Sequence, residues 1–316
     1  MKVIKIYLSC LLLSMALLNL SCSQEINSKT NIPKESSSAK TRIALAVSDL
    51  SIGTHRLAFG IIEPGIGPIK NDEIKLETFF LQDENNPLLK ETLVAEFQKW
   101  PVGNKGVYTS MATFDRAGKW GIGITYETPN GLIERASTVI DVAEKSLAPF
   151  VGDKAYPSRN ITNAITNNLH DLTTDPTPYS PFYEYTIEKT ITERMSSLIL
   201  FASPAFCTTG TCGPQIDIIK NLHSDFSKEV VFIHVEIYEN PADITGDISN
   251  ASVVQAVKDW NLPSEPWVFL VDEDGIVRQR FEGLATYQEI KSCLLYTSDA
   301  ADDTPCVDLG GRGIIK

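Results

Sequence analysis

The sequence predicts two folded parts, an all-β sandwich followed by an α/β domain. Between residues 42 and 142, apolar side chains alternate with polar ones at a period of two, which is typical of half-buried strands. Beyond residue 180, short apolar runs alternate with stretches that repeat at helical spacing, which predicts a sheet covered by helices. With 316 residues, of which 43% are hydrophobic, the chain is long enough for two cores.

The N-terminus has the composition of an export signal. Two lysines precede an apolar run from Ile6 to Leu20, and small residues follow at Ser21 and Cys22. A basic start, a short apolar run and small residues at a cleavage site are typical of secretory signal peptides. We therefore expect residues 1–21 to be a signal peptide and the mature chain to work outside the cytoplasm.

The run LLNLSC, which ends at Cys22, resembles a bacterial lipoprotein processing site. The resemblance implies that Cys22 is lipidated, that residues 22–41 form a polar, serine-rich tether, and that the protein is anchored to the membrane in the periplasm or at the cell surface. Stable anchoring needs more than one acyl chain, as lipoproteins carry. Simple cleavage and secretion is the alternative.

Residues 293–316 differ in character from the chain before them. A helical pattern gives way to the small, acidic and glycine-rich string CLLYTSDAADDTPCVDLGGRGIIK. This string resembles the translation of a common transposase-based sequencing adapter, with both halves in order. The resemblance implies an artefactual tail and a natural sequence interrupted near Ser292, inside its last helix. A natural disordered tail is the alternative.

The charge argues against a nucleic-acid partner. The formal net charge is −12, and no basic run reverses that sign locally. No apolar stretch beyond the N-terminal one is long enough to span a membrane. We identify no motif for a cofactor, and the N-terminal part has no convincing metal-binding cluster.

The first part, residues 42–142, reads as short strands separated by turns. Its segment GVYTSMATFDRAGKWGIGI resembles the immunoglobulin-like modules of bacterial exported proteins, which implies an immunoglobulin-like β-sandwich. The clearest alternating segments are residues 43–47, 57–61, 74–80 and 120–126, and the turn clusters are 63–68, 102–106, 115–118 and 128–131.

The proline-punctuated stretch 143–179 is predicted to be a linker with some local order. The segments that follow alternate between the two periods. They are a helix over 183–194, a strand over 196–203, a helix from Cys212, a strand over 229–239, a helix over 251–262, a hairpin over 267–283 that turns at Asp274 and Gly275, and a closing helix.

Of the six cysteines, only Cys207 and Cys212 lie outside the signal, the processing site and the tail. Two cysteines in a chain large enough to bury its own cores are not needed as structural staples. A functional pair is the sharper interpretation, and a structural or inert pair is the alternative.

The order of elements over residues 180–292, together with FASPAFCTTGTCGPQ and SEPWVFLVD, resembles the thioredoxin-like fold. The resemblance implies that Cys207 and Cys212 lie at the start of a helix, where a thiolate is favoured. It also implies that Pro266 is a cis-proline beside them; a trans proline at the start of an edge strand is the alternative. The implied function is extracytoplasmic thiol-disulfide exchange with protein thiols and disulfides and with a redox partner that the sequence does not identify.

The spacing of the cysteines departs from that family, because four residues separate them instead of two. A continuous helix would place their α-carbons about 7.5 Å apart, beyond the ~7 Å limit for a disulfide. A turn at Gly210 would bring them closer. We favour Cys207 as the nucleophile and Cys212 as the resolving cysteine. The hydroxyls of Thr208, Thr209 and Thr211 either donate to a thiolate or line a solvated loop.

The alternative function is a copper-binding or non-catalytic structural or binding module. Thioredoxin-like copper chaperones use two cysteines and a distant histidine, and soft thiolates suit Cu(I), which would here involve Cys207 and Cys212. His234, however, alternates with apolar neighbours and is interpreted as a structural histidine. Glu236 and Glu265 flank the expected site, either as proton carriers for a buried thiol or as ordinary carboxylates.

Overall fold

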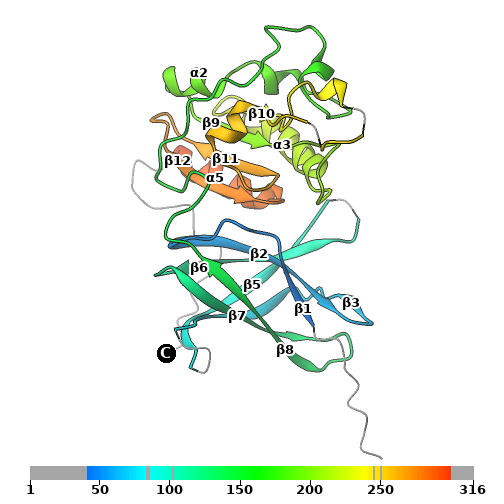
Figure 1. The fold of residues 1–316 in the computed structure, drawn as a ribbon, viewed down its shortest axis with the longest axis vertical. Coiled ribbons are helices and arrows are strands. Elements are labelled where there is room, and N and C mark those ends of the chain that lie inside the picture. Colours follow the sequence, from blue (N-terminus) through cyan, green and yellow to red (C-terminus); the bar gives the residue numbers. More distant parts are fainter. Residues whose placement is uncertain (1–40, 83–85, 102, 245, 250, 300–316) are drawn as a thin grey trace, which may run out of the picture. The chain divides into compact units, whose positions relative to one another are not determined.

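The computed structural model describes residues 41–299 apart from residues 83–85, 102, 245 and 250 (Figure 1). The predicted signal peptide, the lipidation site Cys22 and most of the predicted tether and tail therefore lie outside the described residues. The described residues belong to one compact unit. None of their helices combines the length and the apolar character that crossing a membrane requires.

The first sheet contains the strands of residues 42–142 and is antiparallel throughout (Figure 1). Its order is β1-β2-β6-β5-β4-β7-β8, and β3 pairs with β2. The strands are β1 (Arg42–Leu45), β2 (Gly53–Glu63), β3 (Gly67–Pro68), β4 (Glu73–Phe80), β5 (Leu88–Lys99), β6 (Gly106–Phe114), β7 (Gly118–Glu127) and β8 (Ile133–Val142).

This sheet curves around its own core. Strands β1 and β8, at the two ends of the order, come into contact, so the sheet nearly closes on itself. Inside it lie large aromatic side chains, including Phe59, Tyr108, Phe114 and Trp120, all fully buried. The alternation of apolar and polar residues places these side chains on the enclosed face.

The second sheet has the order β10-β9-β11-β12. Strands β9 and β10 are parallel, and the other two pairs are antiparallel. The strands are β9 (Ser197–Phe201), β10 (Val231–Val235), β11 (Trp267–Val271) and β12 (Val277–Glu282). The helices are η1 (Leu169–Asp171), η2 (Ser180–Tyr183), α2 (Ile187–Thr192), α3 (Cys212–Phe226), η3 (Pro241–Asp243), α4 (Gln255–Asp259) and α5 (Tyr287–Asp299).

Alternate residues of β9 pack into two different cores. Leu198 and Leu200 belong to the core that includes side chains of α3 and α5. Ile199 and Phe201 belong to the core on the other face, with Trp260. This alternation is the period-two rule applied to a strand buried on both sides.

The predicted fold class is wrong. The structure is mostly β, with a single near-closed antiparallel sheet of eight strands in place of an immunoglobulin-like sandwich of two sheets. Strand β5 is the reason, because it pairs with β4 along most of its length and with β6 at its end. It thus joins strands that a sandwich would divide between two sheets.

The second part does not form a clear α/β thioredoxin-like fold either. The predicted helices over 183–194 and 251–262 shrink to the six residues of α2 and the five residues of α4. Positive-φ residues at Arg194 and Asn261 mark their ends. The remaining architecture is a small mixed sheet with two longer helices, α3 and α5.

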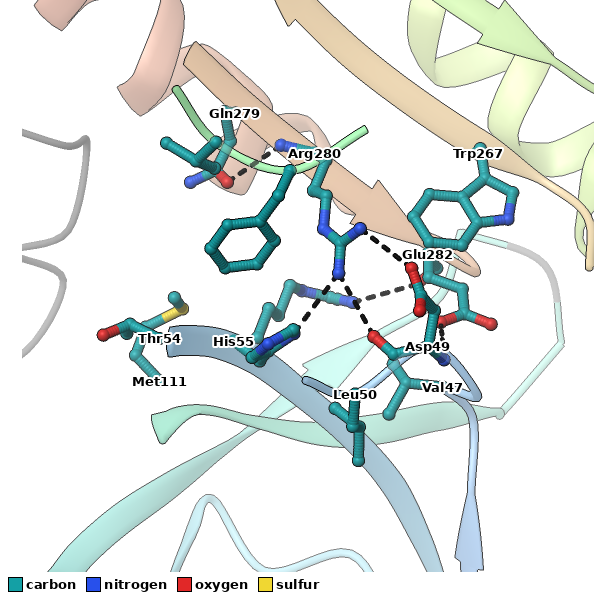
Figure 2. Close-up of a pocket in the computed structure, with 13 residues that line it drawn as sticks. Val47, Asp49, Leu50, Thr54, His55, Met111, Trp267, Gln279, Arg280 and Glu282 are labelled. Atoms are coloured by element: carbon teal, nitrogen blue, oxygen red, sulfur yellow. Dashed lines mark hydrogen bonds and ion pairs between the residues drawn. The ribbon is translucent and has the colours of Figure 1, made fainter. Parts of the chain in front are cut away.

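A buried ionic cluster connects strand β12 to the loop before β2 (Figure 2). Arg280 donates to the Asp49 carboxylate at 2.9 Å, to the Ser146 hydroxyl at 2.6 Å and to His55 Nδ1 at 3.3 Å. The side chains of Arg280 and Asp49 are 7% and 2% exposed. The cavity beside them has a volume of about 30 Å³, which is too small for an organic ligand.

Candidate functional site

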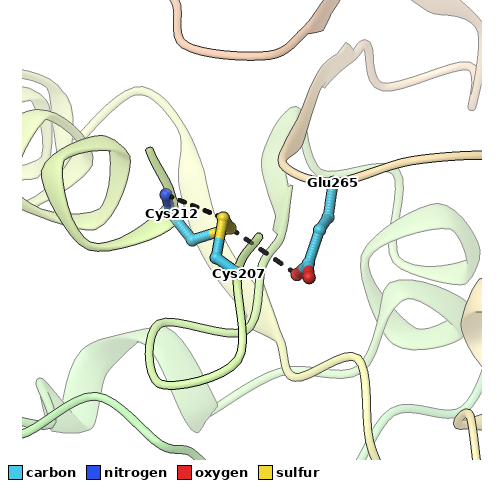
Figure 3. Close-up of side chains that lie close together, drawn as sticks. All are labelled: Cys207, Cys212 and Glu265. Carbon is cyan, nitrogen blue, oxygen red and sulfur yellow. Dashed lines mark hydrogen bonds between the residues drawn. A yellow bond between two sulfur atoms is a disulfide. The ribbon is translucent and has the colours of Figure 1, made fainter. Parts of the chain in front are cut away.

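Cys207 and Cys212 form a disulfide across the loop that follows β9 (Figure 3). Their α-carbons are 6.0 Å apart, within the usual range for a disulfide. Gly210 adopts φ 68° and donates its amide hydrogen to the Cys207 carbonyl oxygen at 3.1 Å. The turn at Gly210 thus brings the sulfurs together despite the four-residue spacing.

The two cysteines differ in exposure and in their neighbours. Cys207 is half-buried, whereas Cys212 is fully buried as the first residue of α3. The backbone amide of Cys212 donates to Cys207 Sγ at 3.3 Å, and Thr209 Oγ1 lies 3.2 Å from the same sulfur. Hydrogen-bond donors and the positive end of a helix both favour a thiolate, so these contacts favour Cys207 as the attacking sulfur.

Glu265 lies on the other side of the disulfide, with its carboxylate directed toward the sulfurs (Figure 3). Its Oε2 atom is 3.5 Å from Cys212 Sγ and accepts a hydrogen bond from the Ser203 amide at 2.9 Å. Burial raises the pKa of Glu265 to about 7, against the effect of the Ser203 hydrogen bond, and the negative charge of Glu236 adds to the rise. This carboxyl therefore exchanges a proton near neutral pH, next to the buried sulfur.

The Glu265–Pro266 peptide bond is cis, as the sequence led us to expect, and Pro266 is buried. Pro266 accepts a hydrogen bond at its carbonyl oxygen from the Gly283 amide at 2.9 Å. Glu282, the residue before Gly283, accepts from the Ser264 hydroxyl at 2.6 Å. The segment that carries Glu265 is thus held on both sides by the end of β12.

Glu236 does not contact the disulfide but holds a neighbouring segment. Its Oε2 atom accepts hydrogen bonds from the amide and the hydroxyl of Thr174, at 2.8 and 2.9 Å. The Thr174 hydroxyl oxygen in turn accepts from the Ala205 amide at 3.1 Å, in the loop that leads to Cys207. Sequence analysis placed Glu236 and Glu265 together at the site, and the structure gives them different neighbours.

His234 is a structural histidine, as interpreted from the sequence. It is 2% exposed, and burial lowers its pKa. Its Nδ1 atom lies 2.7 Å from the Tyr183 hydroxyl, and its Nε2 atom lies 3.0 Å from the Ala202 carbonyl oxygen. Both ring nitrogens are engaged, so this imidazole offers no lone pair to a metal at the cysteines.

The two sulfurs and a Glu265 oxygen lie within 4.8 Å of one another, a spacing that on its own would also accommodate an ion. The donor set, however, does not match Cu(I), which prefers thiolate, thioether and imidazole donors to a carboxylate. In the disulfide, moreover, neither sulfur is a thiolate. The carboxylate in this group of atoms therefore argues against the copper alternative.

Sequence reasoning missed the residues that contact the site from distant segments. Ser203 binds Glu265 through its backbone amide, which carries no side-chain signature. Thr174 binds Glu236 through its amide and its hydroxyl, from the stretch that the sequence predicted to be a linker.

The sequence left Thr208, Thr209 and Thr211 either as hydroxyl donors or as lining of a solvated loop, and in the structure Thr209 Oγ1 lies 3.2 Å from Cys207 Sγ. Neither the protein-family models nor the curated proteins yield a match to this chain.

Proposed function

We propose that the protein is a thiol-disulfide oxidoreductase that uses Cys207 and Cys212 for exchange with protein thiols and disulfides outside the cytoplasm, where the export signal would direct it. The observation that carries this proposal is the asymmetry of the disulfide. One sulfur is accessible and surrounded by donors, and the other is buried beside a carboxyl whose pKa is about 7. A purely structural disulfide needs neither feature.

In the reduced state, the Cys207 thiolate attacks one sulfur of a substrate disulfide. The substrate S–S bond breaks, a mixed disulfide forms with Cys207, and the first substrate thiolate leaves. Cys212 passes its proton to Glu265 and attacks Cys207 Sγ. The mixed disulfide breaks, the second substrate thiolate leaves, and protons taken up by the two thiolates complete the exchange.

The net reaction moves two electrons from the cysteine pair to the substrate disulfide. It yields the Cys207–Cys212 disulfide and two substrate thiols. A dithiol partner reverses the sequence and reduces the pair, and the relative reduction potentials determine which direction predominates. The cell envelope, to which the N-terminal signal and Cys22 point, is a compartment where such exchange operates.

Mixed-disulfide trapping tests this proposal. The full-length reduced protein is mixed with a peptide that contains one disulfide, and adducts are located by mass spectrometry. Cys212→Ser is expected to accumulate a peptide adduct on Cys207, because the resolving sulfur is gone. Cys207→Ser is expected to form at least tenfold less adduct, since Cys212 is fully buried.

Two outcomes would overturn the proposal. One is the absence of an adduct on Cys212→Ser under conditions where free thiols of small molecules react. The other is a wild-type pair that stays reduced when a disulfide oxidant is added. In the latter case, a titration with Cu(I) on the reduced, metal-free chain would test the binding module instead.

A further inference from the structure

Two threonine side chains form a line that ends at Cys207. Thr209 Oγ1 lies 3.2 Å from Cys207 Sγ and 2.7 Å from Thr211 Oγ1. A sulfur in a disulfide carries no proton, so the Thr209 hydroxyl is the donor to Cys207. A hydroxyl has a single proton, so Thr211 is the donor to Thr209. The direction of both hydrogen bonds follows from these two facts.

Thr211 is the N-cap residue of α3, yet its side chain does not cap the helix. A threonine at this position ordinarily accepts a hydrogen bond from an amide of the first helical turn. The side chain of Thr211 makes no such bond, and its φ and ψ of −101° and −14° are helical instead of extended. Thr211 is 3% exposed. Its buried hydroxyl is thus directed to Thr209 instead of to the helix.

We propose that Thr211 and Thr209 form a hydroxyl relay that stabilises the thiolate of Cys207 when the pair is reduced. In this relay Thr209 is a catalytic residue, because it touches the reacting sulfur, and Thr211 is a positioning residue. The inference rests on the proposed function, which requires that Cys207 attack as a thiolate. It names the residues that make the thiolate available.

The physical basis is cooperative hydrogen bonding. A donor to an ionised acceptor contributes more than a donor to a neutral one, so Thr209 stabilises the thiolate more than the disulfide. Thr211 polarises the Thr209 hydroxyl and strengthens that bond. The Cys212 amide at 3.3 Å is a second donor to the same sulfur. Together they surround Cys207 with donors, while the Glu265 carboxylate lies at Cys212.

The rate at which iodoacetamide alkylates Cys207, followed against pH in full-length Cys212→Ser protein, measures the thiolate directly. Mass spectrometry of the Cys207 peptide separates it from the other cysteines. Thr209→Val keeps the shape of the side chain and removes the hydroxyl. It is expected to raise the midpoint of the profile by about one pH unit, the size of one hydrogen bond to a charged group. Thr209→Ser is expected to keep the wild-type midpoint.

The relay also predicts how substitution of Thr211 changes the midpoint of the alkylation profile. Thr211→Val is expected to raise the midpoint by about half as much, because Thr211 acts on the sulfur only through Thr209. In a Thr209→Val background, the same Thr211→Val change is expected to have no further effect. Thr208→Val is the matched control, since Thr208 is a threonine of the same loop that is exposed as Thr209 is, and it is expected to keep the wild-type midpoint.

Equal midpoints for Thr209→Val and Thr208→Val would overturn the relay. An undiminished effect of Thr211→Val in the Thr209→Val background would also overturn it. Alkylation needs no disulfide substrate, so the result is independent of mixed-disulfide trapping. If the alkylation midpoints are as expected but no peptide adduct is trapped, the relay is supported and the proposed function is rejected.

Discussion

Two carboxyl groups of this molecule, the buried Asp49 and the half-buried Glu265, have opposite surroundings. Asp49 accepts hydrogen bonds from groups of residues 146–148 and forms an ion pair with Arg280. Burial raises its pKa, but these partners together bring it below the usual value. Glu265 accepts from the Ser203 amide and faces a sulfur, and burial raises its pKa to about 7.

The contrast separates an acid whose pKa is lowered from one whose pKa is raised to about 7. A buried carboxylate supplied with donors and a cation is stable as an anion and has no tendency to exchange a proton. A carboxyl with fewer donors is costly to ionise, and such a cost is characteristic of sites selected for chemistry. The surroundings of Asp49 fit a structural role for the Arg280 cluster, and those of Glu265 are compatible with the exchange that we propose for the cysteine pair. The predictions below test that division.

The largest expected effect is that of Arg280→Met. Removal of the guanidinium leaves Asp49 buried without its cation, which typically costs about 3–5 kcal/mol. The free energy of unfolding in urea, measured at pH 7, is expected to fall by that amount. A loss below about 1 kcal/mol would show that the Asp49 carboxylate does not depend on Arg280, and the comparison would fail.

The sequence predicted the strands with clear alternation and missed those without it. Residues 57–61, 74–80 and 120–126 fall within β2, β4 and β7. Strand β5 was not predicted, because its apolar residues Leu88, Leu89, Leu93 and Val94 do not alternate. The sandwich prediction failed with it, since β5 joins the neighbouring strands into one sheet.

The sequence predicted the features of the site that short motifs carry, and it did not predict the hydrogen bonds between distant segments. Cys207, Cys212 and the cis bond before Pro266 were expected from the sequence, and the structure contains the disulfide and the cis bond. Glu265 was also expected beside the site, and its Oε2 atom lies 3.5 Å from Cys212 Sγ. Glu236 was expected there too but binds Thr174 instead, in a segment 62 residues away that no local pattern links to it. The donor order of Thr211 and Thr209 depends on the turn between the cysteines.

The predicted boundary at Ser292 lies within helix α5, which continues to Asp299. Cys293 and Leu294 are 3% and 4% exposed and belong to a hydrophobic core. Apolar residues thus keep the helical spacing for one turn beyond the boundary. The adapter resemblance of residues 293–316 remains a prediction about the origin of the sequence, which packing does not address.

Glu265→Gln has the next largest expected effect and acts through pH. The pKa of Glu265 is about 7 in the folded chain against an ordinary 4.5, so the folded state binds more protons between these values. Its contribution to stability is fully present below about pH 4.5 and is lost as the pH rises through about 7. At pH 8, Glu265→Gln is expected to be more stable than wild type by about 1 kcal/mol, after allowance for solvent screening.

The measurement is a series of urea unfolding curves from pH 4 to pH 8 on the oxidised proteins. Glu236 is the acid whose charge also faces Glu265, and Tyr238 is a further titratable neighbour. Glu265→Asp, which keeps the acid, serves as the control and is expected to retain the fall in stability. Identical profiles for wild type and Glu265→Gln would show that the pKa of this carboxyl is the same in the folded and the unfolded chain.

His55→Gln is expected to change the pH profile in the opposite sense. Burial lowers the pKa of His55 to about 4 in the folded chain, and the charge of Arg280 adds to the decrease, against an ordinary value of 6.5. The unfolded chain then binds more protons, so wild-type stability is lost as the pH falls from about 6.5 to about 4.

The effects of His55 and Glu265 oppose each other between about pH 4.5 and 6.5. Glutamine in place of His55 keeps hydrogen-bonding groups near Ser51 and Arg280 but does not titrate. The stability of His55→Gln is expected to fall more steeply with rising pH than that of wild type, by less than about 1 kcal/mol per pH unit. If the stability of His55→Gln followed the same pH dependence as that of wild type, the pKa of His55 would not be lowered in the folded chain.

Arg278→Met is expected to have the smallest effect and sharpens the comparison most directly. Arg278 lies on the same strand as Arg280 and also pairs with an aspartate, Asp272, at 2.6 Å. Its side chain is 44% exposed, so water replaces the lost partner and the pair contributes about 0.5 kcal/mol. Both arginines pair with an aspartate, but only Arg280 is buried. Comparison of Arg278→Met with Arg280→Met thus distinguishes the effect of burial from the effect of losing an ion pair. If Arg278→Met destabilised the chain as much as Arg280→Met, the loss would reflect the strand itself and not the buried charge of Asp49.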